Sequence, residues 1–366
     1  MNKASLGDYV AIKTGKLDAN AADENGLYPF FTCAERVLRI NTPAYDCECV
    51  LVAGNGDLNV KYYSGKFNAY QRTYIIETKD SENLTVPYLY RFLDYYVETL
   101  RNQSIGGVIK YIKLGNLTGA LIPLVGIDEQ HSTVSLFDGL DAVINKTRQQ
   151  LIKYDTLIKS RFVEMFGDLE HGYKCSLRKL DSIAEVGSSK RVFKNELLAE
   201  GVPFYRGTEI AELSAGGAIK PSLFISKEHY ERLIGSTGKP EIGDLLLPSI
   251  CPDGQIWRVN TDTPFYFKDG RVLWIRPDRN AVDGVYLRHA LSTMFQMSFS
   301  NIASGTTFAE LKIFLLKKLS VPLPELKAQK EFVSFVSQVD KLRFATQQQI
   351  DKLETLKKSL MQEYFG

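Results

Sequence analysis

The sequence contains an internal duplication, and this feature limits the folds open to the chain more than any other. Residues 106–167 align with residues 305–366 without a gap, a shift of 199 positions, and 20 of the 62 pairs are identical. Gln130 meets Gln329, Pro123-Leu124 meets Pro322-Leu323, and Phe166-Gly167 meets Phe365-Gly366. The chain is therefore built as two copies of one plan.

The front of each copy also matches, but at a shift of 174 positions. There Leu6 meets Leu180, Lys16 meets Lys190, and Pro29-Phe30-Phe31 meets Pro203-Phe204-Tyr205. The difference between the shifts, 199 minus 174, means that the second copy has 25 extra residues in its middle. Constrained ends around a variable centre indicate a common scaffold that holds two different recognition surfaces.

Each copy has a strand-rich front and a helical back. The fronts, 1–127 and 171–326, contain short β-branched and aromatic runs separated by turn residues, which is typical of twisted β-sheet with flanking helices. The backs, 128–170 and 327–366, carry apolar residues at heptad spacing, which predicts two long coiled-coil helices of about 60 Å each. The predicted seam, or partner interface, comprises Phe137, Ile144, Leu151, Ile158, Met165, Val339, Ile350, Leu353, Leu360 and Tyr364.

Two charged residues interrupt the seam of the second helix, Arg343 and Lys357. They suggest either a helix interface from which water is not fully excluded or a helix face shared with another protein. The fold class that we predict is α+β, with two sheet domains, two long helices and an internal pseudo-two-fold repeat.

Composition excludes several classes of protein. The formal net charge of +2 excludes a histone-like binder, although it says nothing about local basic patches. The longest apolar run, 119–127, is too short to cross a bilayer, and the N-terminus lacks the apolar region of a secretion signal. Five scattered cysteines favour reduced thiols over a disulfide framework. We therefore expect a cytoplasmic protein without membrane contact.

Motifs for catalysis are missing from the sequence. Gly238-Lys239 is followed by Pro240, so it does not form a phosphate-binding loop of the Walker type. Cys47-Glu48-Cys49 has one intervening residue and no second pair, which favours strand residues over a zinc site. No Gly-rich cofactor loop follows a strand. We therefore expect neither a catalytic residue nor a metal or cofactor in this chain.

The ordered, duplicated layout resembles the specificity subunit of type I restriction-modification systems. The first copy carries Ile105-Gly106-Gly107, then Ile122-Pro123, Asp128-Glu129-Gln130 and a helix ending in Phe166-Gly167. The second carries Ala303-Ser304-Gly305, Val321-Pro322-Leu323-Pro324, Gln329 and Phe365-Gly366, and the openings at 6–15 and 180–189 also resemble the family.

The resemblance implies a non-catalytic DNA-binding subunit with four segments. Residues 1–127 and 171–326 would be target-recognition domains, each reading one half of a bipartite site in double-stranded DNA. The helices 128–170 and 327–366 would lie antiparallel, set the spacer and dock two methyltransferase subunits, which use S-adenosylmethionine to methylate adenine. Restriction subunits that use ATP and Mg²⁺ would complete the complex.

Reading bases requires side chains with hydrogen-bonding forks, and phosphate contacts require Lys, Arg or small polar residues. The DNA-binding residues predicted in the first domain are Thr14, Gly15, Lys16, Asn55, Lys61, Tyr62, Tyr70, Gln71, Arg72, Lys110, Tyr111 and Lys113. Those predicted in the second are Ser188, Ser189, Lys190, Arg191, Arg206, Thr208, Gln255, Trp257, Arg258, Lys268, Arg271, Thr306, Thr307 and Lys312. The alternative for each of these residues is a solvated surface charge without DNA contact. For Tyr62 and Trp257 it is a half-buried strand residue.

Two other functions remain open at this point. A coiled-coil scaffold could bridge two protein partners without DNA specificity, although the 25-residue difference between the copies argues for two different half-sites. A fused methyltransferase is disfavoured because the cofactor and base-binding motifs are missing.

Overall fold

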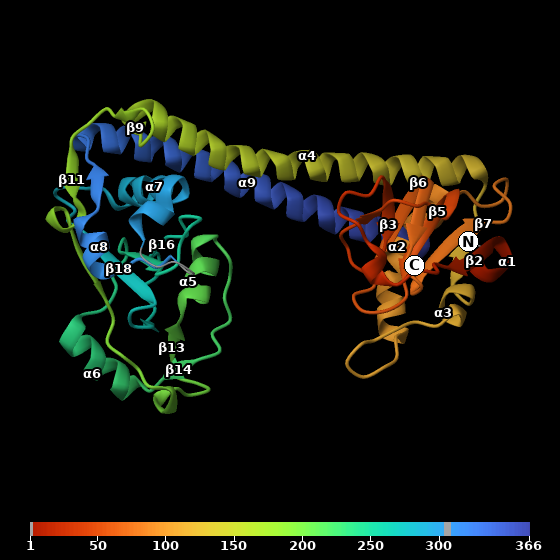
Figure 1. The fold of residues 1–366 in the computed structure, drawn as a ribbon, viewed down its shortest axis with the longest axis horizontal. Helices are drawn as coiled ribbons and strands as arrows, with labels where there is room; N and C mark the ends of the chain where they lie inside the picture. Colours follow the sequence, from red (N-terminus) through yellow and green to blue (C-terminus); the bar gives the residue numbers. More distant parts are fainter. Residues whose placement is uncertain (1–2, 304–308) are drawn as a thin grey trace. The chain divides into compact units, whose positions relative to one another are not determined.

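The computed structural model describes residues 3–303 and 309–366, and the chain divides into two compact units (Figure 1). Unit 1 comprises Met1–Gln149 together with Thr346–Gly366, and unit 2 comprises Gln150–Ala345. Each unit thus contains one sheet-rich part and half of each long helix. The four segments predicted from the sequence differ from this division, because they assign the helices to segments of their own.

Unit 1 is built around a six-stranded sheet in the order β2-β7-β5-β6-β3-β4, in which only β3 and β6 run parallel. Alternate residues of β5 face opposite sides, so Val50 and Val52 pack under helix α2 while Cys49 and Leu51 join a second cluster. The strands of unit 1 are β1 (Lys3–Ser5), β2 (Val10–Thr14), β3 (Tyr28–Phe31), β4 (Leu38–Ile40), β5 (Tyr45–Ala53), β6 (Val60–Ala69), β7 (Thr73–Thr78) and β8 (Leu121–Pro123), of which β1 and β8 form a separate pair.

Helix α2 (Val86–Gln103) supplies the apolar layer against this sheet. The Thr85 hydroxyl caps its N-terminus by accepting from the Tyr88 amide, and Pro87 occupies the first turn, where no amide donor is needed. Leu89, Phe92 and Leu93 are buried at helical spacing. The short helices α1 (Leu6–Tyr9) and α3 (Leu114–Thr118) pack beside it.

Unit 2 contains a four-stranded sheet, β12-β18-β15-β16, and a three-stranded sheet, β14-β13-β17. Its strands are β9 (Gly167–Asp168), β10 (Gly172–Tyr173), β11 (Leu177–Lys179), β12 (Ala184–Ser188), β13 (Val202–Tyr205), β14 (Phe224–Ile225), β15 (Leu245–Pro248), β16 (Trp257–Arg258), β17 (Tyr266–Phe267), β18 (Val272–Pro277) and β19 (Ser320–Pro322). Its helices are α5 (Gly207–Ser214), α6 (Lys227–Thr237), α7 (Gly284–Ile302) and α8 (Ile313–Lys318).

The two long helices are α4 (Ile127–Phe166) and α9 (Leu326–Phe365), each of 40 residues. In unit 1, Phe137 near the start of α4 packs on Tyr364 and Phe365 at the end of α9. In unit 2, Phe162 near the end of α4 packs on Phe332 near the start of α9. Within each unit the two helices therefore run antiparallel.

All ten seam residues predicted from the heptad pattern are buried or half-buried. The two charged interruptions are paired within their own units: the Lys357 ammonium lies 2.7 Å from Asp141, and Arg343 pairs with Asp155. The first helix, expected to end in Phe166-Gly167, ends at Phe166. Gly167 adopts φ +78°, a conformation that ends a helix, and it begins the β9 strand.

The residues that the two copies share form the same clamp twice. In unit 1 the buried Gln130 side chain accepts from the Thr85 amide at 3.0 Å and donates to the carbonyls of Asn83 and Val125 at 2.9 and 3.0 Å. In unit 2 the buried Gln329 accepts from the Asp283 amide at 2.8 Å and donates to two carbonyls on either side. Each glutamine thus ties the start of a domain helix to the start of a long helix.

None of the helices described is both long and apolar enough to span a membrane.

Candidate nucleic-acid interface

In unit 1, the predicted DNA-binding loops meet at one end of the six-stranded sheet. The Gln71 amide donates to the Leu17 carbonyl at 2.8 Å, and the Gly54 amide donates to Arg72 at the same distance. The Gly56 amide donates to the Lys110 carbonyl at 2.9 Å. Loops that are far apart in the sequence therefore form one surface, whose exposed side chains are Thr14, Lys16, Gln71, Arg72, Lys110, Tyr111 and Lys113.

Three predicted residues of unit 1 are engaged within the protein. Lys61 is half-buried and its ammonium donates to the Ala34 carbonyl at 2.9 Å, and burial lowers the pKa of this group. The Tyr62 hydroxyl donates to Glu48 at 2.6 Å, which raises the Tyr62 pKa to about 12. Gly15 is buried, and a Cβ there would lie 2.1 Å from the Ala69 carbonyl oxygen, so its role is a close backbone approach.

In unit 2, five predicted residues line a single hollow of about 440 Å³. The β13–α5 junction contributes two of them, the loop after β15 one, and the β17–β18 turn two. They are Arg206, Thr208, Gln255, Lys268 and Arg271, and the hollow is completed by Gly207, Ala211, Pro248, Ser249 and Ile250. The hollow therefore combines guanidinium forks, an ammonium, a hydroxyl and a carboxamide.

Two carboxylates hold the cations of this hollow in place. Glu209 accepts from the Arg206 guanidinium at 2.6 Å and from the Arg206 amide at 2.9 Å. Burial raises the pKa of Glu209, but the hydrogen bonds from Arg206 outweigh it and hold the pKa at about 2. Glu310 accepts from Lys312 at 2.6 Å, from Ser249 at 2.8 Å and from Arg271 at 2.9 Å. Hydrogen bonds from Lys312, and then from Ser249, lower the Glu310 pKa.

The loop after β12 lies beside the β17–β18 turn. The Ser188 hydroxyl donates to the Val272 carbonyl at 2.7 Å, and that of Ser189 donates to Phe267 at 2.5 Å, so both serines fix the loop. The Lys190 amide donates to the Tyr266 hydroxyl at 2.9 Å, while the side chains of Lys190 and Arg191 are exposed. The two basic side chains are therefore the most exposed of these four residues.

The prediction for Trp257 is wrong. Its side chain is 4% exposed and packs with Phe265 and Tyr205 in a buried aromatic cluster. Arg258 also departs from the prediction, because it pairs with Leu245 at the opposite end of β15 and lies beside Gly284 of α7, away from the hollow. Thr306 and Thr307 lie outside the described residues. For the other predicted residues, DNA contact stays a prediction.

Three residues that orient the basic side chains are not among those predicted from the sequence: Glu209, Glu310 and Ser249. A sequence signal existed only for Glu209, which follows Arg206 by three residues at the start of α5 as in a capping box. Glu310 and Ser249 are brought together by tertiary folding, and no local pattern marks them.

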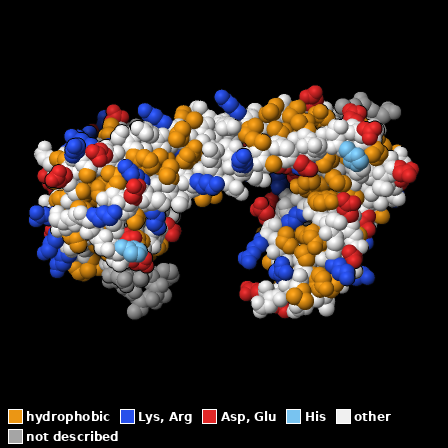
Figure 2. Space-filling view, turned by 90° about the horizontal axis from the view of Figure 1, so that it is seen from above, with side chains coloured by type: hydrophobic (Ala, Val, Ile, Leu, Met, Phe, Trp, Pro, Cys, Tyr) orange, Lys and Arg blue, Asp and Glu red, His pale blue; other side chains and the backbone are white. Residues whose placement is uncertain are grey.

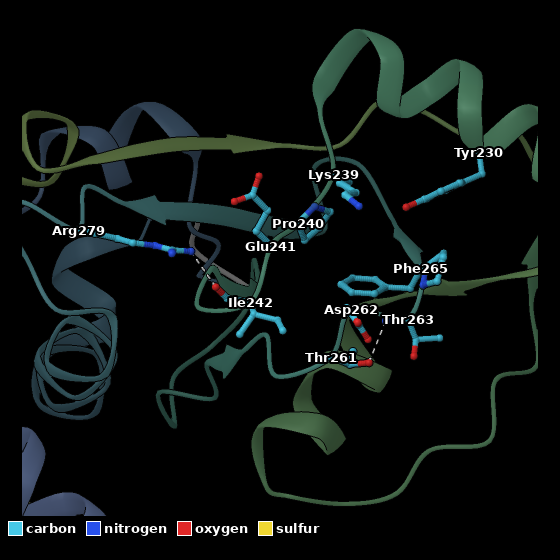
Figure 3. A pocket seen from close by; sticks show the side chains of 11 residues that line it. Tyr230, Lys239, Pro240, Glu241, Ile242, Thr261, Asp262, Thr263, Phe265 and Arg279 are labelled. Atoms are coloured by element: carbon cyan, nitrogen blue, oxygen red, sulfur yellow. Dashed lines mark hydrogen bonds between the residues drawn. The ribbon is translucent and has the colours of Figure 1, made fainter.

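A second hollow of unit 2, about 380 Å³, lies elsewhere. Figure 3 shows the Tyr230 side chain reaching from α6 toward Lys239, with Phe265 below them. None of its lining residues belongs to the predicted DNA-binding set. Among the described residues, no group of His, Cys, Asp and Glu side chains is placed to hold a metal ion.

Acidic and basic side chains are interspersed on the face shown in Figure 2. This matches the formal net charge of +2. Most of the predicted DNA-binding residues fall in two loop clusters. We call them the unit 1 cluster (residues 14–17, 54–56, 70–72 and 110–113) and the unit 2 cluster (188–191, 206–208, 249–255, 268–271 and 310–312).

Comparisons with known proteins point to one family. The family described as type I restriction modification DNA specificity domain matches residues 1–154 and 174–355. The type I restriction enzyme EcoDI specificity subunit of Escherichia coli is 29% identical over 373 residues, covering 91% of this chain and 80% of that protein. A putative type I restriction enzyme specificity subunit of Haemophilus influenzae is 24% identical, covering 86% of this chain and 77% of the relative.

Solved structures share the fold. The S subunit of a type I restriction-modification system from M. genitalium matches 100% of this chain and 96% of its own, with a TM-score of 0.55 and 16% identity. A chain from a study of complex assembly and conformational transition of the type I R-M system matches 99% of this chain and 96% of its own, with a TM-score of 0.62 and 15% identity.

Proposed function

This chain belongs to the family of type I restriction modification DNA specificity domains, and we propose that its two units each read one half of a bipartite DNA target. The chain is a specificity subunit that recognises DNA. It would contribute no catalytic group to the complex. The unit 1 cluster would contact one half-site and the unit 2 cluster the other. The differences between their loops would make the two half-sites different in sequence.

The observation that carries this proposal is the presence of one exposed polar and basic loop cluster in each unit. The clusters are built at the same place in both copies, because Lys16 and Lys190 follow the equivalent strands β2 and β12, and Lys113 and Lys312 precede α3 and α8. Arg206, fixed by Glu209, presents a fork of donors of the kind that reads guanine in the major groove.

The long helices would set the distance between the half-sites and dock two methyltransferase subunits as a coiled-coil pair. Several large apolar side chains on α4 and α9 are exposed, and a partner that covered them would remove this apolar area from water. They include Val143, Ile152, Leu342 and Phe344. These exposed positions lie outside the seam and are free to meet a partner.

The remaining activities would belong to partner subunits. Adenine methylation would need S-adenosylmethionine in the methyltransferase subunits, and restriction subunits would use ATP and Mg²⁺. Such a complex would act in the cytoplasm, where the chromosome and these small molecules are present.

The test is to express the chain with its methyltransferase subunits and to map methylated adenines by single-molecule sequencing. We expect one bipartite motif with a fixed spacer. Gln71→Ala should relax or change one half only, and Gln255→Ala the other, so each variant is the control for the other. Methylation without a bipartite motif, or a motif untouched by both variants, would contradict the proposal.

A scaffold that bridges two proteins without reading DNA is not favoured, because the family is defined by DNA specificity.

A further inference from the structure

The loop between α2 and α3 ends in an apolar tip within the unit 1 cluster. Val108 is fully exposed and Ile109 is 62% exposed. These two neighbouring aliphatic side chains are left in water, so a partner that covered both would be stabilised by their burial. The tip is preceded by Gly106 and Gly107 and followed by Lys110.

The tip is held as a defined hairpin-like loop. The Ile105 amide donates to the Tyr111 carbonyl at 3.0 Å, and the Tyr111 amide donates back to Ile105 at 2.9 Å. Gly106 adopts φ +118°, and a Cβ there would lie 2.6 Å from the Ile109 carbonyl oxygen, so only glycine fits this turn. The Gly56 amide fixes the loop from the side through the Lys110 carbonyl.

The surroundings of the tip favour a polyanion as its partner. Lys110 and Lys113 are exposed on the loop itself, and Arg72 is joined to the same region through Gly54. Asp57, on the adjoining turn, lies 3.6 Å from the Arg101 guanidinium, which offsets its charge. An apolar tip within a basic rim matches the chemistry of DNA, whose apolar base faces lie between charged backbones.

We propose that Val108 and Ile109 form a wedge that inserts between base pairs of the half-site read by unit 1. This inference rests on the proposed function and adds a second source of specificity, the deformability of the DNA. Targets with base-pair steps that unstack easily at the insertion point would be preferred. The gap-free repeat places Thr307 and Phe308 opposite Val108 and Ile109. Those two residues lie outside the described part of the chain, but the sequence retains a bulky apolar residue at this position in both copies.

The test uses the complex of the chain with its methyltransferase subunits and duplexes carrying 2-aminopurine at successive positions of the identified target. The wild-type complex should increase fluorescence at a step in the unit 1 half-site, apart from the signal of the adenine flipped for methylation. Val108→Ser/Ile109→Ser should abolish the first signal, keep the second, and weaken binding about 10-fold.

Two control variants separate the wedge from other effects. Leu27→Ser removes another exposed aliphatic side chain of unit 1, 72% exposed, and should change neither fluorescence nor affinity. Lys110→Ala should lower the slope of log affinity against log salt by about 1, as expected for the loss of one phosphate contact. The double serine variant should leave this slope unchanged.

Three outcomes would overturn the wedge. The first is unchanged fluorescence and affinity in the double serine variant. The second is weaker binding by that variant when the wild-type complex gives no signal from an unstacked step. The third is loss of the methyltransferase subunits when the variant is purified, which would assign the tip to a protein contact. The proposed function fails separately, if the wild-type complex shows no preference for any DNA sequence.

Discussion

The ammonium of Lys357 lies 2.7 Å from one oxygen of Asp141, and the other oxygen of the same carboxylate accepts from Arg91 at 2.6 Å. Asp141 thereby joins α9, α4 and α2 within unit 1. Arg91 is 5% exposed, so its charge depends on this carboxylate and on Asp138. Burial raises the pKa of Asp141, but hydrogen bonds from Lys357 and Arg91 outweigh it and lower the pKa overall.

Replacing Asp141 by Ala should destabilise unit 1 by about 3 kcal/mol, because it leaves buried Arg91 with only one carboxylate. Hydrogen exchange followed by mass spectrometry should show faster exchange in α2 peptides. The matched control is Asp155→Ala, which removes the carboxylate that pairs with Arg343. Because this carboxylate is 73% exposed, its loss should lower the free energy of unfolding by at most about 1 kcal/mol. Equal effects of both changes would contradict the role given to Asp141.

The glutamine clamps should be costly to remove. Gln130→Leu leaves the Thr85 amide and two carbonyls without their partner, and Gln329→Leu does the same around Asp283 in unit 2. We expect a loss of about 2–3 kcal/mol of unfolding free energy in each case, measured by urea denaturation. Gln149→Leu on the exposed face of α4 should change it by less than about 0.5 kcal/mol. Similar midpoints for Gln130→Leu and Gln149→Leu would rule out the clamp.

The basic loop after β12 should contact phosphates. Lys190→Ala and Arg191→Ala should each weaken DNA binding by the assembled complex to a similar extent on all sequences, and lower the slope of log affinity against log salt by about 1. Filter binding or fluorescence anisotropy over a range of salt concentrations measures both. Lys194→Ala, an exposed lysine just beyond the loop, serves as the control. A changed sequence preference with an unchanged salt slope would instead make these residues base readers.

His289 should make unit 2 sensitive to mild acid. Burial, followed by the charges of Arg288 and Arg343, lowers its pKa from 6.5 to about 3, and its Nε2 atom is buried without a partner. As pH falls below about 6.5 the unfolded chain binds a proton that the folded chain refuses, so stability is lost between about pH 6.5 and 3. His289→Leu should remove this part of the loss, about 1–2 kcal/mol between pH 7 and 5. Parallel pH profiles of the wild-type and variant chains would contradict it.

Much of the scaffold could be predicted from the sequence because its signals are periodic or repeated. The heptad spacing located α4 and α9 to within a few residues, and the shared Gln130 and Gln329 marked positions that the structure buries twice. The end of α4 coincides with the repeated Phe-Gly pair, because Gly167 takes a left-handed conformation that stops the helix.

The candidate site was less predictable, because residue type does not determine burial. Trp257 and Arg258 are adjacent on a two-residue strand, and only the pairing with β15 decides that the indole enters an aromatic cluster. Arg206 and Arg271 were found by their chemistry, but the carboxylates that fix them come from different parts of the chain. Sequence patterns reveal the donors of such a site more readily than the contacts that orient them.

The division of the chain has a consequence for its synthesis. Unit 2 is one continuous stretch, Gln150–Ala345, whereas unit 1 needs Thr346–Gly366 to complete its core, where Phe365 packs on Tyr88, Phe92 and Phe137. We therefore expect unit 2 to fold while translation continues, and unit 1 to wait until Thr346–Gly366 has left the ribosome. Unit 1, whose first segment precedes unit 2 in the sequence, would then finish folding after it.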